Sequence, residues 1–350
     1  MTSTGAFGAF MRYGNEKDIT VLAGDIGGTK TELALYSSQG GLRRPQVKEK
    51  FASRDYSGLE AIVKSFLSHH GRHVDRAAFG VAGPVVGGRA KITNLPWVME
   101  EAALAQSLGI NSVCLINDVT AFANAVAVLV ENDLHVIQKG SPAAEGTMAV
   151  AAPGTGLGEA FLVWDGTGYR AYGSEGGHAD FAPSGPEESA LLAFLANRYD
   201  HVSYERVCSG MGLANIYAYL KHTGWTEAPD CLVRQVPAGQ DPVPEIIRGA
   251  LDQNRPCGLC QKTLEMFVSV LGAEAGNLAL KTMATGGIYL GGGIPPRVLP
   301  LLENGGFLNA FVRKGRMAEL MKKIPVSVML HPEAALLGAA RHAMTTRCAA

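Results

Sequence analysis

Each half of this 350-residue chain opens with the same short plan: a strand, a glycine-rich turn and a second strand. The first turn runs from Asp25 to Thr29 and the second from Gly154 to Gly158. A turn that lacks Cβ atoms lets backbone N–H groups point at phosphate oxygens. Two such turns, one in each half, predict a duplicated architecture in which two loops bind one polyphosphate.

Apolar periodicity predicts the elements around these turns. Hairpin strands followed by alternating strands and helices favour a mixed sheet in an α/β domain. The later part of the second half is mostly helical. Predicted strands are 19–23, 32–36, 47–53, 77–82, 113–116, 147–151, 160–164, 169–172, 287–290 and 326–330, and predicted helices are 57–70, 97–108, 120–130, 187–198, 211–221, 243–251, 259–283, 296–302 and 333–344.

Composition excludes several classes of protein. Hydrophobic residues make up 47% and charged residues 18%, which is too apolar for a disordered chain. The net charge of −1 gives no basic surface for nucleic acid. Residues 1–17 contain no continuous apolar stretch of the kind found in signal peptides, and the apolar run 121–130 is about half a membrane span. We therefore expect a soluble cytoplasmic protein with no membrane or nucleic-acid partner.

Six cysteines are spread along the chain, which is too sparse for a disulfide-stapled secreted domain. We expect free thiols in a reducing cytoplasm. Cys257 and Cys260 form a CxxC pair, but no second pair completes the four ligands of a structural zinc site. The sequence therefore predicts no zinc.

Asn117 and Asp118 follow an apolar strand and precede a helix. A carboxylate at the carboxyl end of a buried strand faces the ligand crevice in α/β folds, where it can take a proton from a hydroxyl nucleophile. An Asp in front of a helix is also a preferred N-cap. From these residues alone the two interpretations stay open.

Glu175 and His178 flank two glycines, so both side chains can face a ligand that lies close to the backbone. Sugar hydroxyls need such paired donors and acceptors, whereas one Glu and one His make a thin metal-ligand set. Glu205 taken alone is interpreted as a solvated surface acid. The glycine-rich run 286–293 offers a bare backbone for the face of an adenine, or is a plain strand–helix turn.

Together these motifs, in this order, resemble those of the bacterial glucokinase family, over about residues 19 to 343. The resemblance implies a two-domain actin-like (ribonuclease H-like) ATPase fold with an interdomain cleft. It implies ATP and Mg²⁺ as cofactors, and transfer of phosphate to the 6-hydroxyl of D-glucose. The motifs are Gly24-Asp25-Ile26-Gly27-Gly28-Thr29, Asn117-Asp118, Gly154-Thr155-Gly156-Leu157-Gly158, Glu175-Gly176-Gly177-His178 continuing to Pro183, Glu205-Arg206, and Gly287 to Gly293.

The same resemblance implies roles for individual residues. Asp118 would be the catalytic base, and Asp25 would hold Mg²⁺ through water. The domains would be a flexible extension 1–18, a small α/β domain 19–128 plus 325–346, and a large one 129–324, in a homodimer. Sugar would be bound by Asn94, Asn117, Asp118, Glu175, His178 and Glu205, and nucleotide by Asp25, Gly27, Gly28, Thr29, Gly154, Thr155, Gly156, Gly158, Gly291 and Gly292.

The sequence departs from the pattern of related kinases in two places, and two alternative functions remain. The cysteine cluster of zinc-binding ROK kinases does not follow His178, which favours the non-zinc branch, and Lys30 stands where some family members have Asn. A kinase for another hexose or an N-acetylhexosamine would share the base and differ in its hydroxyl contacts. A sugar-responsive ROK-type repressor needs an N-terminal helix-turn-helix of about 60 residues, and about 18 precede the first strand here.

Overall fold

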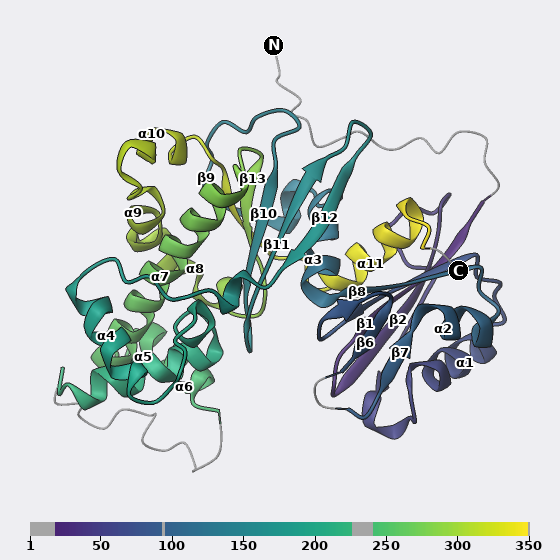
Figure 1. Cartoon of the computed structure of the whole chain (residues 1–350), viewed down its shortest axis with the longest axis horizontal. Coiled ribbons are helices and arrows are strands. Elements are labelled where there is room, and N and C mark those ends of the chain that lie inside the picture. The colour runs from purple at the N-terminus through teal and green to yellow at the C-terminus, as the bar shows by residue number, and fades with distance from the viewer. Residues whose placement is uncertain (1–17, 93–94, 226–240, 349–350) are drawn as a thin grey trace. The chain divides into compact units, whose positions relative to one another are not determined.

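The computed structural model of the chain describes residues 18–92, 95–225 and 241–348 (Figure 1). It divides into two compact units. The first comprises residues 1–133, 164–173 and 331–350, and the second residues 134–163 and 174–330. The predicted flexible extension lies outside the described residues, except for Asp18.

The first unit contains a five-stranded sheet with the order β3-β2-β1-β4-β8. β1 pairs antiparallel with β2, and β2 with β3, whereas β4 and β8 run parallel to β1. The carboxyl ends of β1, β4 and β8 therefore share one edge of the sheet. The strands are β1 (Thr20–Ile26), β2 (Lys30–Ser37), β3 (Val47–Ala52), β4 (Arg76–Val81) and β8 (Ser112–Asn117).

Helices cover both faces of this sheet (Figure 1). On one face α1 (Leu59–His70) buries Ile62 and Phe66, and α2 (Glu101–Leu108) packs in the same core. On the other face α11 (Ala334–Thr345) packs its alanines against β1 and β4. Small side chains allow α11 to lie close to the sheet and to α3 (Asp118–Val126).

The predicted helix 97–108 is wrong in its first turn. Residues Val98–Glu100 form β7, the last strand of a small antiparallel sheet with β5 (Val85–Val86) and β6 (Arg89–Lys91). Met99 pairs with Ala90, so tertiary pairing overrides the helical spacing. The predicted helix 120–130 begins earlier, at Asp118, and ends at Val126.

The strands β9, β10, β11, β13 and β14 of the second unit belong to a six-stranded sheet with the order β12-β11-β10-β13-β14-β9. β10, β13 and β14 are parallel, and β11 and β9 pair antiparallel with their neighbours. The edge strand β9 was not predicted from sequence. The strands are β9 (Leu134–Gln138), β10 (Met148–Pro153), β11 (Leu157–Trp164), β12 (Tyr169–Ser174), β13 (Gly287–Leu290) and β14 (Val326–Met329).

The helices of the second unit gather around α7 (Gly258–Thr282), whose side chains are buried on several sides. α7 contacts α5, α6, α9 and β10, which explains why its sequence lacks a clean polar face. α9 and α10 were not predicted. The remaining helices are α4 (Pro186–Ala196), α5 (Gly210–His222), α6 (Val243–Leu251), α8 (Leu299–Glu303), α9 (Gly306–Val312) and α10 (Ala318–Met321), with 3-10 turns at Gly176–His178 and Tyr204–Arg206.

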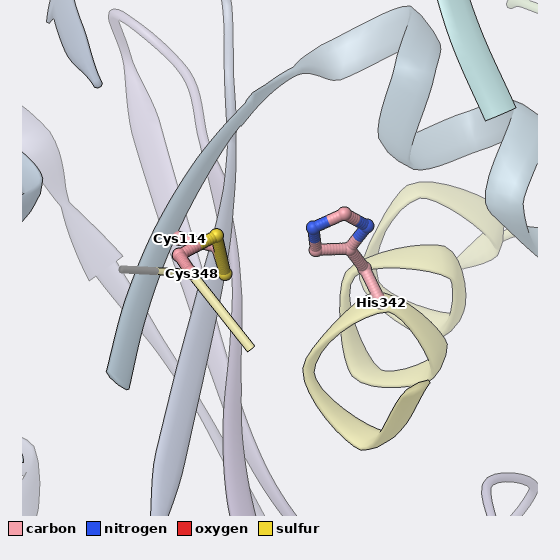
Figure 2. Close-up of side chains that lie close together, drawn as sticks. All are labelled: Cys114, His342 and Cys348. Atoms are coloured by element: carbon pink, nitrogen blue, oxygen red, sulfur yellow. A yellow bond between two sulfur atoms is a disulfide. The ribbon is translucent and has the colours of Figure 1, made fainter. Parts of the chain in front are cut away.

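The prediction of free thiols throughout is wrong. Cys114 on β8 and Cys348 in the C-terminal segment form a disulfide with their Cα atoms 5.5 Å apart (Figure 2). Cys257 is also disulfide-bonded, and among the described residues Cys208 and Cys260 are buried thiols. The sequence separation of 234 positions between Cys114 and Cys348 hides this proximity from sequence reasoning.

No helix in the described ranges of the chain is long and apolar enough to cross a membrane.

Candidate active site

The first glycine-rich turn joins β1 to β2 and is held by Ser53. The Gly27 amide donates to the Lys30 carbonyl at 2.9 Å, which closes the turn. The Ser53 hydroxyl donates to the Gly27 carbonyl at 2.8 Å, and its amide to the Thr29 carbonyl at 3.1 Å. Ser53 thus donates hydrogen bonds to two carbonyl groups of the loop. Sequence reasoning missed it.

Asp25 lies near the end of β1 and is half-buried. Burial and, to a lesser extent, the nearby Asp118 carboxylate raise the pKa of its carboxyl to about 6, against the opposing effect of Lys30. Two carboxylates at one sheet edge repel each other until a cation lies beside them. A divalent cation therefore fits the chemistry of this pair, as predicted for Asp25.

The side chain of Lys30 is hydrogen bonded to that of Glu32 on the same strand, β2. Its ammonium donates to the Glu32 carboxylate at 2.7 Å, and this hydrogen bond is the main cause that raises the pKa of Lys30. Glu32 is only 6% exposed, and the ammonium groups of Lys48 and Lys50 lie 3.8 and 3.7 Å from its other oxygen. Lys30 therefore balances a buried acid in its own unit.

Asn117, and not Asp118, is the N-cap of α3. Its Oδ1 accepts from the amides of Val119 at 2.9 Å and Thr120 at 3.2 Å. Its Nδ2 donates to the Gly83 carbonyl at 3.1 Å and to Asp118 Oδ1 at 2.9 Å. The cap interpretation of Asp118 is thereby replaced, because the preceding residue does the capping.

Asp118 is the first helical residue of α3 and follows directly on β8. Its Oδ1 accepts from Asn117 and from the Val119 amide, so the carboxylate is oriented by two donors. It lies at the sheet edge that also carries Asp25, close enough to shift the pKa of Asp25. The first unit thus brings the predicted base and the first phosphate loop together.

The second unit brings three glycine-containing segments together. The loop after β10 closes on itself through the Gly154 amide and the Gly156 carbonyl at 2.8 Å. Gly210, at the start of α5, donates to the Gly154 carbonyl at 2.8 Å. A Cβ on Gly292 would lie 2.5 Å from the Pro153 carbonyl oxygen, so the turn after β13 packs directly on this loop. Only glycine suits Gly292, whose φ is +77°.

Glu205 is a structural partner of the second loop, contrary to the expectation of a solvated acid. Its Oε2 accepts from the Leu157 amide at 3.0 Å. A Cβ on Gly156 would lie 2.4 Å from the same oxygen, which explains the glycine. The other oxygen, Oε1, lies 3.9 Å from His178 Nε2. Glu205 therefore joins the phosphate loop to the predicted sugar segment.

Glu175 and His178 stand at either end of a 3-10 turn after β12. His178 Nδ1 lies 3.6 Å from Glu175 Oε2, which places the imidazole between two carboxylates. Both side chains are exposed, Glu175 at 73% and His178 at 62%, so they are open to a ligand. The glycines between them are tightly packed, since a Cβ on Gly177 would lie 2.1 Å from the Leu157 carbonyl oxygen.

Beneath this segment lies a pair of buried acids that sequence reasoning missed. Glu159 on β11 and Glu274 on α7 are 2% and 0% exposed, and the charge of Glu274 acts on the Glu159 carboxyl. Oε1 of each finds no hydrogen-bond donor among the described residues. Burial, followed by the Glu274 charge, raises the pKa of Glu159, while the Lys281 ammonium lowers it, and the net direction is upward, so Glu159 tends to keep its proton. Glu159 Oε2 lies where a Cβ of Gly176 would be.

The predicted site residues thus fall into two sets, one per unit. The first unit contains Asp25, Gly27, Gly28, Thr29, Asn117 and Asp118. The second unit contains the other predicted site residues that the structure describes. Asn94 lies outside the described residues.

Comparisons with known proteins agree on one family. The family model described as Glucokinase matches residues 22–346. The glucokinase of Nostoc punctiforme is 43% identical over 335 residues, covering 91% of this chain and 97% of that protein. The glucokinase of Synechocystis sp. is 39% identical over 350 residues, covering 92% and 97%.

Solved structures agree on the fold. A crystal structure of glucokinase from an Antarctic psychrotroph has a TM-score of 0.81 at 31% identity, covering 93% of this chain and 99% of that one. A ROK family glucokinase from Streptomyces griseus, solved with glucose and AMPPNP, has a TM-score of 0.62 at 20% identity, covering 93% and 100%. The predicted α/β two-domain fold is confirmed.

Proposed function

Because the chain belongs to the glucokinase family, we propose that it transfers the terminal phosphoryl group of ATP to the 6-hydroxyl of D-glucose. The products are glucose 6-phosphate and ADP. The Streptomyces griseus protein of the same fold was solved with glucose and the ATP analogue AMPPNP, which supports this pair of substrates.

Asp118 is the general base. One observation carries this role: Asn117 caps α3 and also donates to Asp118, so the Asp118 carboxylate is oriented without being needed as a cap. The carboxylate accepts a hydrogen bond from the 6-hydroxyl and takes its proton as the phosphoryl group arrives in line. The 6-oxygen attacks phosphorus, and the bond to the ADP oxygen breaks.

The sugar is held by side chains with matching donors and acceptors. Asn117, Glu175, His178 and Glu205 bind its other hydroxyls, with Asn94 as a further contact. The exposure of Glu175 and His178, and the two carboxylates on either side of the imidazole, support this assignment. Carboxylates accept two hydroxyl donors each, which suits vicinal hydroxyls.

The two glycine loops bind the phosphates of ATP through backbone amides, with the Thr29 and Thr155 hydroxyls as further donors. Gly291 and Gly292 line the adenosine site. Asp25 would hold Mg²⁺ through water, and the bound ion would neutralise charge on the transferring group. The raised pKa of Asp25 beside Asp118 supports a cation at this place.

Replacement of the base is the first test of the mechanism. In Asp118→Asn, we expect kcat to fall by about 10²- to 10⁴-fold, because the amide cannot accept the proton. The dissociation constant of glucose should stay within a few-fold of wild type. A variant with near-normal kcat and intact folding would contradict the assignment of Asp118.

A panel of sugars and donors tests the reaction itself. Glucose with ATP should give the highest kcat/KM in a coupled assay, above mannose, fructose and N-acetylhexosamines. A higher value for another sugar, or for ADP or polyphosphate as donor, would overturn the substrate assignment.

We also propose that the protein is a cytoplasmic homodimer that serves glycolysis. Cell fractionation would test the location, and sedimentation would test the dimer.

A further inference from the structure

The disulfide between Cys114 and Cys348 has no part in the proposed reaction. Cys114 lies on β8, three residues before Asn117, and is 1% exposed. Cys348 lies beyond the end of α11 and is half-buried. Of the two sulfur atoms, that of Cys348 is therefore the more accessible to a thiol or a phosphine.

A third side chain, His342, completes the cluster. Figure 2 shows its ring directed from α11 toward the two sulfur atoms. One ring nitrogen and both sulfur atoms lie within 4.8 Å of one another. Burial, and to a lesser extent the neighbouring Arg341, lowers the pKa of His342 to about 4. The imidazole is therefore neutral at neutral pH, which is the form that ligates metals.

Hydrogen bonds hold the C-terminal segment in place independently of the disulfide. The Cys348 amide donates to the Ser112 hydroxyl at 3.1 Å, and this hydroxyl donates to the Cys348 carbonyl at 3.3 Å. Arg76 donates to the carbonyl of Met344 at 3.1 Å. Because β4, β8 and the C-terminal segment are tied in this way, the two sulfur atoms should stay close when the S–S bond is broken.

We propose that Cys114, His342 and Cys348 form a redox-gated metal site, closed by the disulfide when oxidised and able to bind one Zn²⁺ when reduced. Two thiolates and one imidazole are a ligand set that zinc prefers, and water can fill the fourth position. Two thiolates also match the charge of the ion. The site shares no residue with the proposed active site.

The chemical steps balance with a dithiol as the two-electron reductant. A dithiol attacks the Cys348 sulfur, ends as a disulfide, and leaves two protein thiols that have gained two electrons and two protons. Zinc then displaces one proton from each thiol. With zinc–sulfur bonds of about 2.3 Å in a tetrahedral site, the sulfur atoms end roughly 3.8 Å apart, so Cys348 must swing away from Cys114.

Zinc uptake by the full-length protein tests the proposal. We would use the Cys257→Ser/Cys260→Ser double variant as the background, because reduction would otherwise also turn Cys257 into a thiol, which with Cys260 could bind metal. The protein is reduced with a water-soluble phosphine, which becomes a phosphine oxide, and is then titrated with zinc against a chromogenic chelator. We expect one zinc per chain when reduced and none when oxidised.

Added variants locate the ligands. Cys348→Ser should abolish uptake, and His342→Gln should weaken zinc binding at least tenfold, since even residues that only support a ligand contribute about 10- to 100-fold. Cobalt should give a thiolate charge-transfer band in the reduced background and none in Cys348→Ser. Glucose-dependent turnover verifies folding. No uptake by the reduced background, or equal uptake by Cys348→Ser, would overturn the proposal.

Discussion

At the scale of single residues, Asn117 and Asp118 show how neighbouring positions divide two tasks. Asn117 satisfies the first amides of α3 and orients the next side chain. Asp118 is then held at the edge of the sheet as an acceptor. Loss of an N-cap costs about 1 kcal/mol, and this contribution to helix stability comes from Asn117 and not from the proposed base.

Asp25 gives a pH prediction. Its carboxyl has a pKa of about 6, so it is protonated in a growing fraction of molecules as the pH falls below 6. If Asp25 serves the metal, the KM for ATP with Mg²⁺ should rise by up to about tenfold per pH unit there. Asp25→Asn should raise KM at every pH, and the ratio of variant to wild type should shrink below pH 6. Because the variant and the wild type are compared at the same pH, the titration of ATP affects both KM values equally and cancels from their ratio. A constant ratio would contradict the role.

The buried acid Glu159 gives a second pH prediction. Because its folded pKa is raised, the native state keeps a proton that the unfolded chain loses above about pH 4.3, so stability is full below that pH and falls as the pH rises. The slope can reach about 1.4 kcal/mol per pH unit. Glu159→Gln mimics the protonated acid, so its stability relative to wild type should increase with pH.

Urea unfolding at pH 5 and pH 8 measures this difference. Glu265→Gln on the exposed side of α7 is the matched control and should track wild type at both values. If Glu159→Gln and wild type keep the same difference in unfolding free energy at both pH values, Glu159 does not hold the proton.

At the scale of elements, the glycine loops are fixed by packing as much as by turn geometry. Gly156 makes room for the Glu205 carboxylate, and Gly177 for the Leu157 carbonyl. The second glycine loop and the predicted sugar segment are therefore in direct backbone contact. A change in one is expected to reach the other.

Gly177→Ala tests this coupling. Its Cβ would lie 2.1 Å from the Leu157 carbonyl oxygen, so the 3-10 turn must move. Overpacking of this kind costs about 1–3 kcal/mol, and both the glucose and ATP affinities should weaken. Gly185→Ala is the control, because nothing lies within 4 Å of its Cβ and its φ is −177°. Unchanged binding in Gly177→Ala would show that the two segments are independent.

At the scale of the whole molecule, the disulfide closes a long loop that contains the entire second unit. Cys348→Ser should lower the unfolding free energy by about 2–5 kcal/mol without reductant, because the unfolded chain regains its freedom. Thermal or urea unfolding with a chelator present measures it. Reduced wild type should unfold like reduced Cys348→Ser. A difference that persists under reductant would mean that the serine disturbs packing instead.

Much of this protein follows from local sequence. Alternating apolar residues and glycine-rich turns predict the strands that precede Asp25 and Asp118, and the predicted ranges for 243–251 and 287–290 agree with the structure. The motifs also indicate the family that the comparisons establish. Backbone propensity and turn chemistry act over a few residues, so they can be read from neighbours in the chain.

The tertiary structure decided which side chains become partners. It assigned the cap to Asn117, placed Glu205 against a loop 48 residues away, and paired Cys114 with Cys348. It also buried Glu159 against Glu274, a pair that no local pattern distinguishes from surface acids. Each partnership depends on which segments the packed cores bring together. Hydrophobic burial that drives this packing is non-directional, so the sequence pattern alone does not say which distant side chains will meet.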